Sequence, residues 1–156
     1  MNTLSRTDLQ VARDEFLAFR LGDEEYAIDI SNVQEIKGYS AITTIPNAPA
    51  YVRGVMNLRG TMIPVVDLRA RFGMPVKDYT KFTVIIIVTI ADRIYGLVVD
   101  AVSDVLNLAG ADLEPPPELG DALDTSFMTG IARNGDRLIT VLQVDRALGI
   151  AGSSVS

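Results

Sequence analysis

Residues 52–68, V-R-G-V-M-N-L-R-G-T-M-I-P-V-V-D-L, carry the most informative local pattern in this chain. Two short apolar runs flank the segment Asn57-Leu58-Arg59-Gly60, and Asn and Gly favour a tight reversal between strands. The stretch therefore predicts a β-hairpin with Arg59 at its tip. A turn needs no arginine for its backbone geometry, so Arg59 is a candidate functional residue.

The sequence on either side of this hairpin also predicts strands. Residues 16–21 and 26–30 form two apolar runs separated by a Gly-Asp-Glu-Glu turn. Ser31 stands where a helix cap would, so residues 32–36 are expected to form a short helical turn or a bend. Residues 67–72 predict a strand end that leads into a short helix. Residues 83–90, T-V-I-I-I-V-T-I, are β-branched and apolar throughout, which is typical of a strand covered on both faces.

An internal repeat organises these strands. Residues 16–36 match residues 85–105 without a gap, since residue 16 falls on residue 85, an offset of 69. The hairpin has its own counterpart further along, where Gly54 falls on Gly130, an offset of 76. The offset grows by 7 between the two matches, which indicates one longer loop in the second half, placed at residues 110–125. Two matches in the same order predict a duplicated fold.

The repeat predicts an all-β fold of two packed, five-stranded β-barrel subdomains with short helical segments. Neither half alone could cover such apolar strands. Each half either is self-contained or lends strands to the other, and the sequence leaves both arrangements open. Arg59 aligns with Gly135 in the second half, so the scaffold does not require arginine there. What differs between duplicated halves is where function is to be sought.

The composition excludes several classes of function. The 156 residues are 48% hydrophobic and 22% charged, which suits one domain with a buried core. The net charge of −6 and the 6% aromatic content argue against nucleic-acid binding. With no Cys and no His, the usual zinc sites and nucleophile–base pairs are excluded, and no phosphate-binding motif is present. We therefore expect a protein that is not an enzyme and has no cofactor or metal.

The chain also carries no targeting or membrane-spanning pattern. Residues 1–14 are polar and are expected to form a flexible lead-in rather than a secretory signal, and residues 151–156 a flexible tail. The longest apolar run, residues 84–91, is far shorter than the roughly 20 residues that span a bilayer. A cytoplasmic protein without direct membrane insertion is expected.

Two local questions remain open at this level. Arg59 is either a polar anchor in an interface or a solvated charge paired with a nearby carboxylate such as Asp67. Val33 and Ile36 either pack inward at helical spacing, with Glu35 solvated, or line an apolar groove between the two β units.

Three stretches together resemble a known family. They are residues 15–39 (E-F-L-A-F-R-L-G-D-E-E-Y-A-I-D-I-S-N-V-Q-E-I-K-G-Y), residues 54–69 (G-V-M-N-L-R-G-T-M-I-P-V-V-D-L-R) and residues 96–106 (G-L-V-V-D-A-V-S-D-V-L). Their order and spacing are similar to those of the bacterial chemotaxis coupling proteins, the CheW-like domain family. The resemblance covers residues 15–150, which are expected to form a single CheW-like domain of two SH3-like barrels.

The resemblance implies a role and a set of contact residues. Members of this family are non-catalytic adaptors that join the cytoplasmic tip of methyl-accepting chemoreceptors to the regulatory domain of the histidine kinase CheA. The receptor site implied for this chain comprises Val33, Glu35, Ile36, Asn57, Arg59, Gly60 and Val84. The implied kinase site comprises Ile42, Thr43 and Arg53, and a second kinase contact would involve Glu114 and Leu119. Family members can carry a basic residue and an aromatic in that last loop, where this chain has Glu114 and Leu119.

The resemblance leaves two wirings open. The first is a chemotaxis adaptor in membrane-associated receptor arrays, monomeric in isolation. The alternative is a CheW-like scaffold of a non-flagellar chemosensory pathway with a dedicated receptor and kinase. A small β-barrel enzyme or a nucleic-acid binder is the remaining class, and the missing His and Cys and the acidic charge oppose it.

Overall fold

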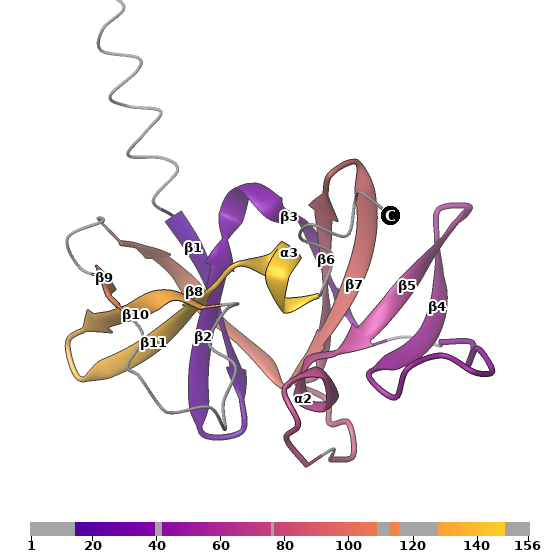
Figure 1. Cartoon of the computed structure of the whole chain (residues 1–156), viewed down its shortest axis with the longest axis horizontal. Helices are drawn as coiled ribbons and strands as arrows, with labels where there is room; N and C mark the ends of the chain where they lie inside the picture. The colour runs from indigo at the N-terminus through magenta and orange to yellow at the C-terminus, as the bar shows by residue number, and fades with distance from the viewer. Residues whose placement is uncertain (1–14, 40–41, 76, 109–112, 116–127, 149–156) are drawn as a thin grey trace, which may run out of the picture. The chain divides into compact units, whose positions relative to one another are not determined.

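The computed structural model describes residues 15–39, 42–75, 77–108, 113–115 and 128–148 (Figure 1). These residues form two β-sheets with a few one-turn helices between the strands. The chain divides into two compact units. We call Phe19–Asp23 with Asn32–Val102 the central unit, and the described residues outside these two segments the terminal unit.

A six-stranded sheet of order β8-β1-β2-β11-β10-β9 lies mostly in the terminal unit, while residues 19–21 of β1 and residues 101–102 of β8 belong to the central unit. The strands of this sheet are β1 (Glu15–Leu21), β2 (Glu24–Asp29), β8 (Ala101–Asn107), β9 (Leu113–Glu114), β10 (Met128–Asn134) and β11 (Arg137–Leu142). β11 pairs parallel with β2, while β10 pairs antiparallel with both β9 and β11. Small and branched side chains fill its core: Ala18, Ala27, Leu106, Leu108, Ala132, Ile139 and Val141.

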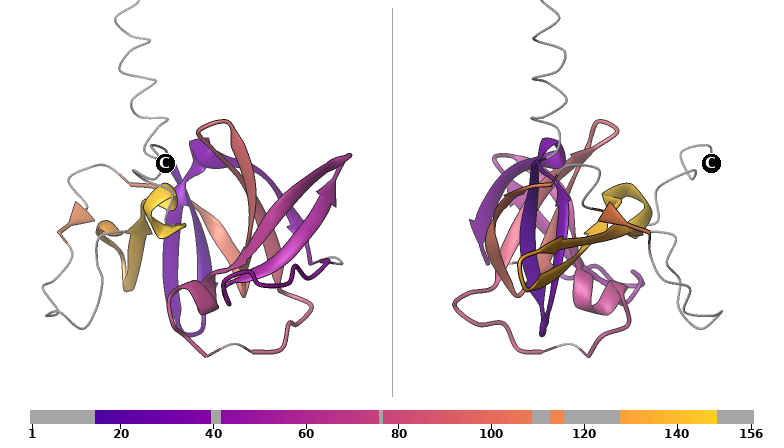
Figure 2. Two further views of the ribbon diagram at one scale, coloured as in Figure 1. Left: turned by 45° about the vertical axis from the view of Figure 1, so that its right-hand side comes forward. Right: turned by 90° about the vertical axis from the view of Figure 1, so that its left-hand side faces the viewer.

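The central unit is built on a five-stranded sheet of order β3-β6-β7-β5-β4. Its strands are β3 (Val33–Gly38), β4 (Val52–Leu58), β5 (Thr61–Asp67), β6 (Val84–Ile90) and β7 (Arg93–Val99). The β4–β5 hairpin is drawn in magenta in Figures 1 and 2 and leads directly into α2 (Leu68–Arg71). The core consists of Met56, Leu58, Ile63, Val65, Ile85, Ile87 and Val98.

The bounds of the elements follow the sequence repeat. Shifting β1 by 69 residues gives the range of β6, and shifting β4 by 76 residues gives the range of β10. The same shift of 76 carries α2 onto α3 (Val144–Ala147). Under this mapping, the order β3-β6-β7-β5-β4 becomes β8-β1-β2-β11-β10, which is the order of five consecutive strands in the other sheet. The predicted duplication and the all-β class are therefore confirmed.

The sheet order also decides between the two arrangements that the sequence left open. The β1–β2 hairpin lies in the sheet that holds β8, β10 and β11, and the β6–β7 hairpin lies in the sheet that holds β3, β4 and β5. Each half of the chain thus lends its first hairpin to the sheet of the other half. One sheet has six strands rather than five because the two-residue strand β9 adds to its edge.

One local prediction is wrong. Residues 33–36 are not a helical turn but the start of strand β3, preceded by the short 3-10 helix η1 (Ile30–Asn32). The segment pairs antiparallel with β6, with a bulge between Val33 and Glu35. The apolar strand β6 offers a long-range backbone partner that the local pattern around Ser31 could not reveal, and strand pairing overrides the weak helix signal.

Candidate functional site

The tip of the β4–β5 hairpin is held by its own side chains. The Asn57 carboxamide oxygen accepts a hydrogen bond from the Gly60 amide at 2.8 Å, which closes the turn. Arg59 and Gly60 have φ angles of 50° and 92°, in the left-handed region that glycine adopts without penalty. The equivalent position in the second hairpin is Gly135, with φ 66°. Arg59 thus occupies a backbone conformation that disfavours any residue with a Cβ atom.

The Arg59 side chain forms an ion pair with Glu35 of β3. The alternative in which Arg59 pairs with a nearby carboxylate is thus what the structure shows, but the partner is Glu35 and not Asp67, because Asp67 lies at the far end of β5 and is buried. The hydrogen bond from Arg59 holds the pKa of the Glu35 carboxyl below its ordinary value, and the same bond raises the pKa of Arg59. The Arg59 side chain is 62% exposed, so solvent screens the pair and it adds little to stability.

The remaining residues of the predicted receptor set lie on one face of β3 and β6. Val33 is directly opposite Val88, Ile36 is opposite Ile86, and Gly38 is opposite Val84. Opposed residues of an antiparallel pair project to the same face, and this is the face away from the core residues Ile85 and Ile87. Val33 and Val84 are half-buried, and Ile36 is 43% exposed. An inward-packed Ile36 is thereby excluded.

The predicted kinase residues gather around Gly54 of β4. Thr43 and Val55 exchange two backbone hydrogen bonds, of 2.8 and 2.9 Å, and this bridge brings residues 42 and 43 across Gly54. A Cβ atom on Gly54 would overlap the Thr43 carbonyl group, so glycine is required by close approach. Ile42 packs against the core of the central unit. Arg53 is exposed, with its guanidinium 5.6 Å from the centre of the Tyr79 ring.

The predicted second kinase contact is described only in part. Glu114 is exposed on β9, and its carboxylate accepts a 2.9 Å hydrogen bond from Arg133 of β10. Leu119 lies outside the described residues.

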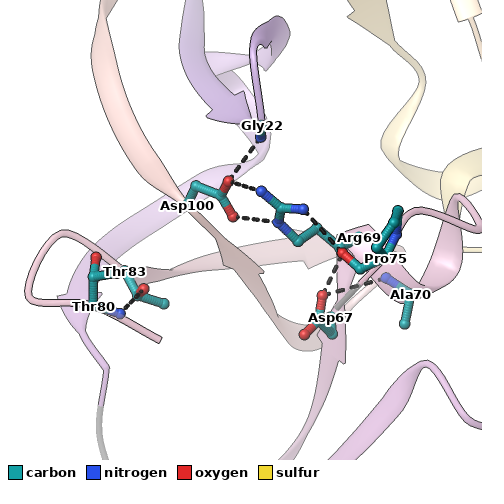
Figure 3. Close-up of polar contacts among 8 residues, drawn as sticks. All are labelled: Gly22, Asp67, Arg69, Ala70, Pro75, Thr80, Thr83 and Asp100. Carbon is teal, nitrogen blue, oxygen red and sulfur yellow. Dashed lines mark hydrogen bonds and ion pairs between the residues drawn. The ribbon is translucent and has the colours of Figure 1, made fainter. Parts of the chain in front are cut away.

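A partly buried polar network that the sequence did not predict lies at the other end of β5 (Figure 3). Arg69 donates two hydrogen bonds to the Asp100 carboxylate, at 2.8 and 2.5 Å, and a third to the Pro75 carbonyl at 2.9 Å. Asp100 also accepts a bond of 2.7 Å from the Gly22 amide. Asp67 caps α2 by accepting from the amides of Arg69 and Ala70. Three segments distant in sequence, at residues 22, 67–75 and 100, are joined in this way.

The electrostatics of the network follow from these bonds. Partial burial by itself would raise the pKa of Asp100, but the hydrogen bonds from Arg69 and the Gly22 amide outweigh it, and the pKa lies below its ordinary value. The hydrogen bond to Asp100 raises the pKa of Arg69. A pocket of about 260 Å³ adjoins the network, but the charged groups of Arg69 and Asp100 are already bonded to one another. We assign the network a structural role.

A signal for this network was present in the repeat. Asp67 aligns with Gln143 and Arg69 with Asp145, so the second half lacks the same groups. Gln143 makes no side-chain cap to α3. Comparison of the two halves could therefore have singled out these residues, as it did Arg59.

The described part of the chain holds no group of three or more carboxylate side chains placed to bind a metal ion. Among the same residues, no helix has the length and apolar character needed to cross a bilayer.

Fold and site together define a duplicated all-β protein with an exposed, charged hairpin tip. The family model of the CheW-like domain matches residues 15–151. The chain belongs to the CheW-like domain family.

Individual relatives cover most of the chain. It is 41% identical over 146 residues to the chemotaxis protein CheW of Klebsiella aerogenes, covering 94% of this chain and 88% of the relative. It is 42% identical over 131 residues to the chemotaxis protein CheW of Rhizobium meliloti, covering 84% of each. Among solved structures, the scaffolding protein TtCheW from Thermoanaerobacter tengcongensis superposes with a TM-score of 0.81 at 37% identity, covering 90% of this chain and 95% of that one.

Proposed function

We propose that this chain is a non-catalytic cytoplasmic adaptor of bacterial chemotaxis. It would couple the cytoplasmic tip of methyl-accepting chemoreceptors to the regulatory domain of the histidine kinase CheA in membrane-associated arrays. Membership of the CheW-like family and the similarity to proteins named as chemotaxis and scaffolding proteins support this role.

The conformation of Arg59 is the observation that carries the receptor part of the proposal. The duplicated scaffold accepts glycine at the same turn position, and Arg59 is held there in a left-handed backbone conformation. A residue kept where its backbone is unfavourable points to a function for its side chain. At the exposed tip, the guanidinium can form charge-assisted hydrogen bonds with a partner.

The neighbouring face of β3 and β6 supplies the apolar part of the contact. A chemoreceptor tip is a helical hairpin, and a helix is recognised through a stripe of apolar side chains flanked by polar ones. The exposed Ile36 and the half-buried Val33 and Val84 fit the apolar stripe. Arg59 and Glu35 would supply the polar part of the contact from the edge of the sheet, since Glu35 lies opposite Ile87 and projects to the other face of β3. Gly60 and Asn57 would act indirectly, by fixing the turn.

The kinase part of the proposal rests on the residues around Gly54 of β4. Ile42, Thr43 and Arg53 come together around Gly54. The second contact, at Glu114 and Leu119, stays a prediction.

NMR titration of the labelled full chain tests both surfaces. A receptor-tip fragment should shift the signals of residues 33–36, 57–60 and 84. The kinase regulatory domain should shift those of residues 42, 43 and 53. Arg59→Ala and Arg59→Gly should each weaken receptor binding roughly 10- to 100-fold. Kinase binding and the thermal midpoint should stay nearly unchanged, because the side chain is exposed.

The matched control is Arg146→Ala, which removes an exposed arginine from the terminal unit. It should leave receptor binding at the parent value. Full receptor affinity in Arg59→Gly, or loss of folding in Arg59→Ala, would show that the assigned role is wrong.

A further inference from the structure

Two tyrosines and an arginine form a compact surface group in the central unit. The ring centres of Tyr39 and Tyr79 are 4.3 Å apart, with 51° between their planes. The Arg53 guanidinium lies 5.6 Å from the Tyr79 ring centre, at the distance of a cation–π contact. Tyr39 is 40% exposed, Tyr79 is half-buried and Arg53 is exposed. We call these three residues the tyrosine–arginine surface.

Tyr79 fixes this surface to the interior. Its hydroxyl donates a 2.9 Å hydrogen bond to the second oxygen of Asp67. Asp67 is only 1% exposed, and the amides of Arg69 and Ala70 hold its other oxygen. Burial, and then the bond to Asp67, raises the pKa of Tyr79, so the hydroxyl remains a donor at neutral pH. The ring is therefore fastened at its buried end while its face supports Arg53.

The charge of Arg53 is not neutralised within the described part of the chain. The ion pairs found there use Arg59, Arg69, Arg133 and Arg137, but not Arg53. An arginine laid over a fixed aromatic ring loses little side-chain freedom when it binds a partner. Such an arrangement suits a planar carboxylate, which can accept two parallel hydrogen bonds from a guanidinium.

The residues around Arg53 indicate which partner the tyrosine–arginine surface contacts. Arg53 directly precedes Gly54, across which Ile42 and Thr43 lie. These are the residues assigned to the kinase contact under the proposed function. The half-buried Ile42 and the exposed face of Tyr39 provide apolar surface beside the cation. A partner residue with a carboxylate on a short aliphatic stem fits both features.

We propose that Tyr39, Arg53 and Tyr79 bind an aspartate or glutamate side chain of the kinase regulatory domain. Arg53 contacts the carboxylate, and Tyr79 is the positioning residue that presents Arg53. This inference rests on the proposed function, since it takes the partner from there. It adds two residues that neither the sequence nor the repeat singled out.

A double-mutant cycle on the full chain tests the inference. Calorimetric titration with the kinase regulatory domain measures Kd for the parent, Arg53→Ala, Tyr79→Leu and the double variant, each at low and high salt. Arg53→Ala should raise Kd at least tenfold and flatten its salt dependence. Tyr79→Leu should raise Kd by a similar factor, and the double variant should be no weaker than the weaker single variant. Arg53→Lys keeps the charge but not the planar guanidinium, so its Kd should lie between those of the parent and Arg53→Ala.

Controls separate a local effect from a structural one. Arg20→Ala removes another exposed arginine of the central unit and should leave Kd unchanged. Binding of the receptor-tip fragment should not change in any variant. Tyr79→Phe keeps the ring without the bond to Asp67 and should raise Kd less than Tyr79→Leu. If Tyr79→Leu does not fold, Tyr79→Phe and Tyr39→Leu complete the cycle with Arg53→Ala.

The failures of the two proposals differ in outcome. An unchanged Kd in Arg53→Ala overturns the inference and leaves the coupling role itself intact, whereas absence of kinase binding by the parent chain would overturn the proposed function. A raised Kd in Arg53→Ala, with additive effects of the tyrosine variants, leaves the proposed function intact and overturns only the positioning role of Tyr79.

Discussion

Two residues of the β4–β5 hairpin, Arg59 and Gly54, have different reasons for their identity. At Arg59 the backbone favours glycine, so the arginine is explained by what its side chain can contact. At Gly54 no side chain fits, because the Thr43 carbonyl group occupies the space. Gly54 also has φ 146°, a value that other residues rarely adopt. Close packing therefore sets the residue at position 54, and we propose that contact with a partner sets the residue at position 59.

Replacing Gly54 with alanine should lower the free energy of unfolding by about 2–4 kcal/mol, because the new methyl group forces the Thr43–Val55 bridge apart. Urea unfolding measures the loss, and amide exchange at Thr43 and Val55 should accelerate. Gly38→Ala is the control, since a Cβ there meets no atom within 4 Å. Equal stability of Gly54→Ala and the parent would contradict the packing argument.

The one-turn helices show how the same element is stabilised differently in the two halves. Asp67 caps α2, but its counterpart Gln143 makes no side-chain hydrogen bond to α3. Gln143 nevertheless has the extended backbone of a cap, with φ −92° and ψ 110°. A residue with a shorter polar side chain at position 143 could therefore cap α3 without a change in the backbone.

Changing Gln143 to aspartate should raise the free energy of unfolding by about 0.5–1 kcal/mol, because a short carboxylate can accept from the first free amides of α3. Thermal and urea unfolding measure the gain. In the reverse test, Asp67→Ala should cost more, about 2–4 kcal/mol, since it leaves the Tyr79 hydroxyl and two amides without an acceptor. Destabilisation by Gln143→Asp would exclude this account of the cap.

Strand β3 marks the limit of prediction at the level of elements. Turn residues and β-branched runs correctly predicted the β4–β5 hairpin and the buried strand β6. Residues 32–36 are predicted to form a helical turn or a bend from the cap signal at Ser31, and residues 33–36 instead begin strand β3. Its conformation is set by pairing with β6, more than 45 residues away in sequence.

At the scale of the whole molecule, hairpins exchanged between the two halves build the sheets. The Arg69–Asp100 pair joins three segments of the central unit. It links the β1–β2 turn, through the Gly22 amide, to the loop after α2 and to the end of β7. Arg69 is buried, and its side chain is 9% exposed, while that of Asp100 is 34% exposed.

Changing Asp100 to asparagine should lower the free energy of unfolding by about 1–3 kcal/mol at neutral pH, because buried Arg69 loses its carboxylate partner. The folded protein holds the pKa of Asp100 below its ordinary value of 3.8. The stabilisation is therefore complete above that value and is lost as the pH falls through the folded pKa.

Urea unfolding at a series of pH values checks this prediction. The difference between parent and variant should be constant from about pH 5 to 8 and should shrink below about pH 4. A difference that stayed the same down to about pH 2 would show that the charge of Asp100 is not what stabilises the unit.

The sequence by itself determined most of the strands, the duplication and the difference between the two halves at Arg59, but not strand β3. Apolar alternation and turn chemistry are local properties, and the offsets of 69 and 76 reproduce the bounds of the repeated strands to within one residue. Only the tertiary structure decided which sheet each hairpin joins, that Arg59 is paired with Glu35, and that Asp67 holds Tyr79. These features depend on which distant strands pair, and that choice is made by the summed packing of the sheets rather than by any one stretch of sequence.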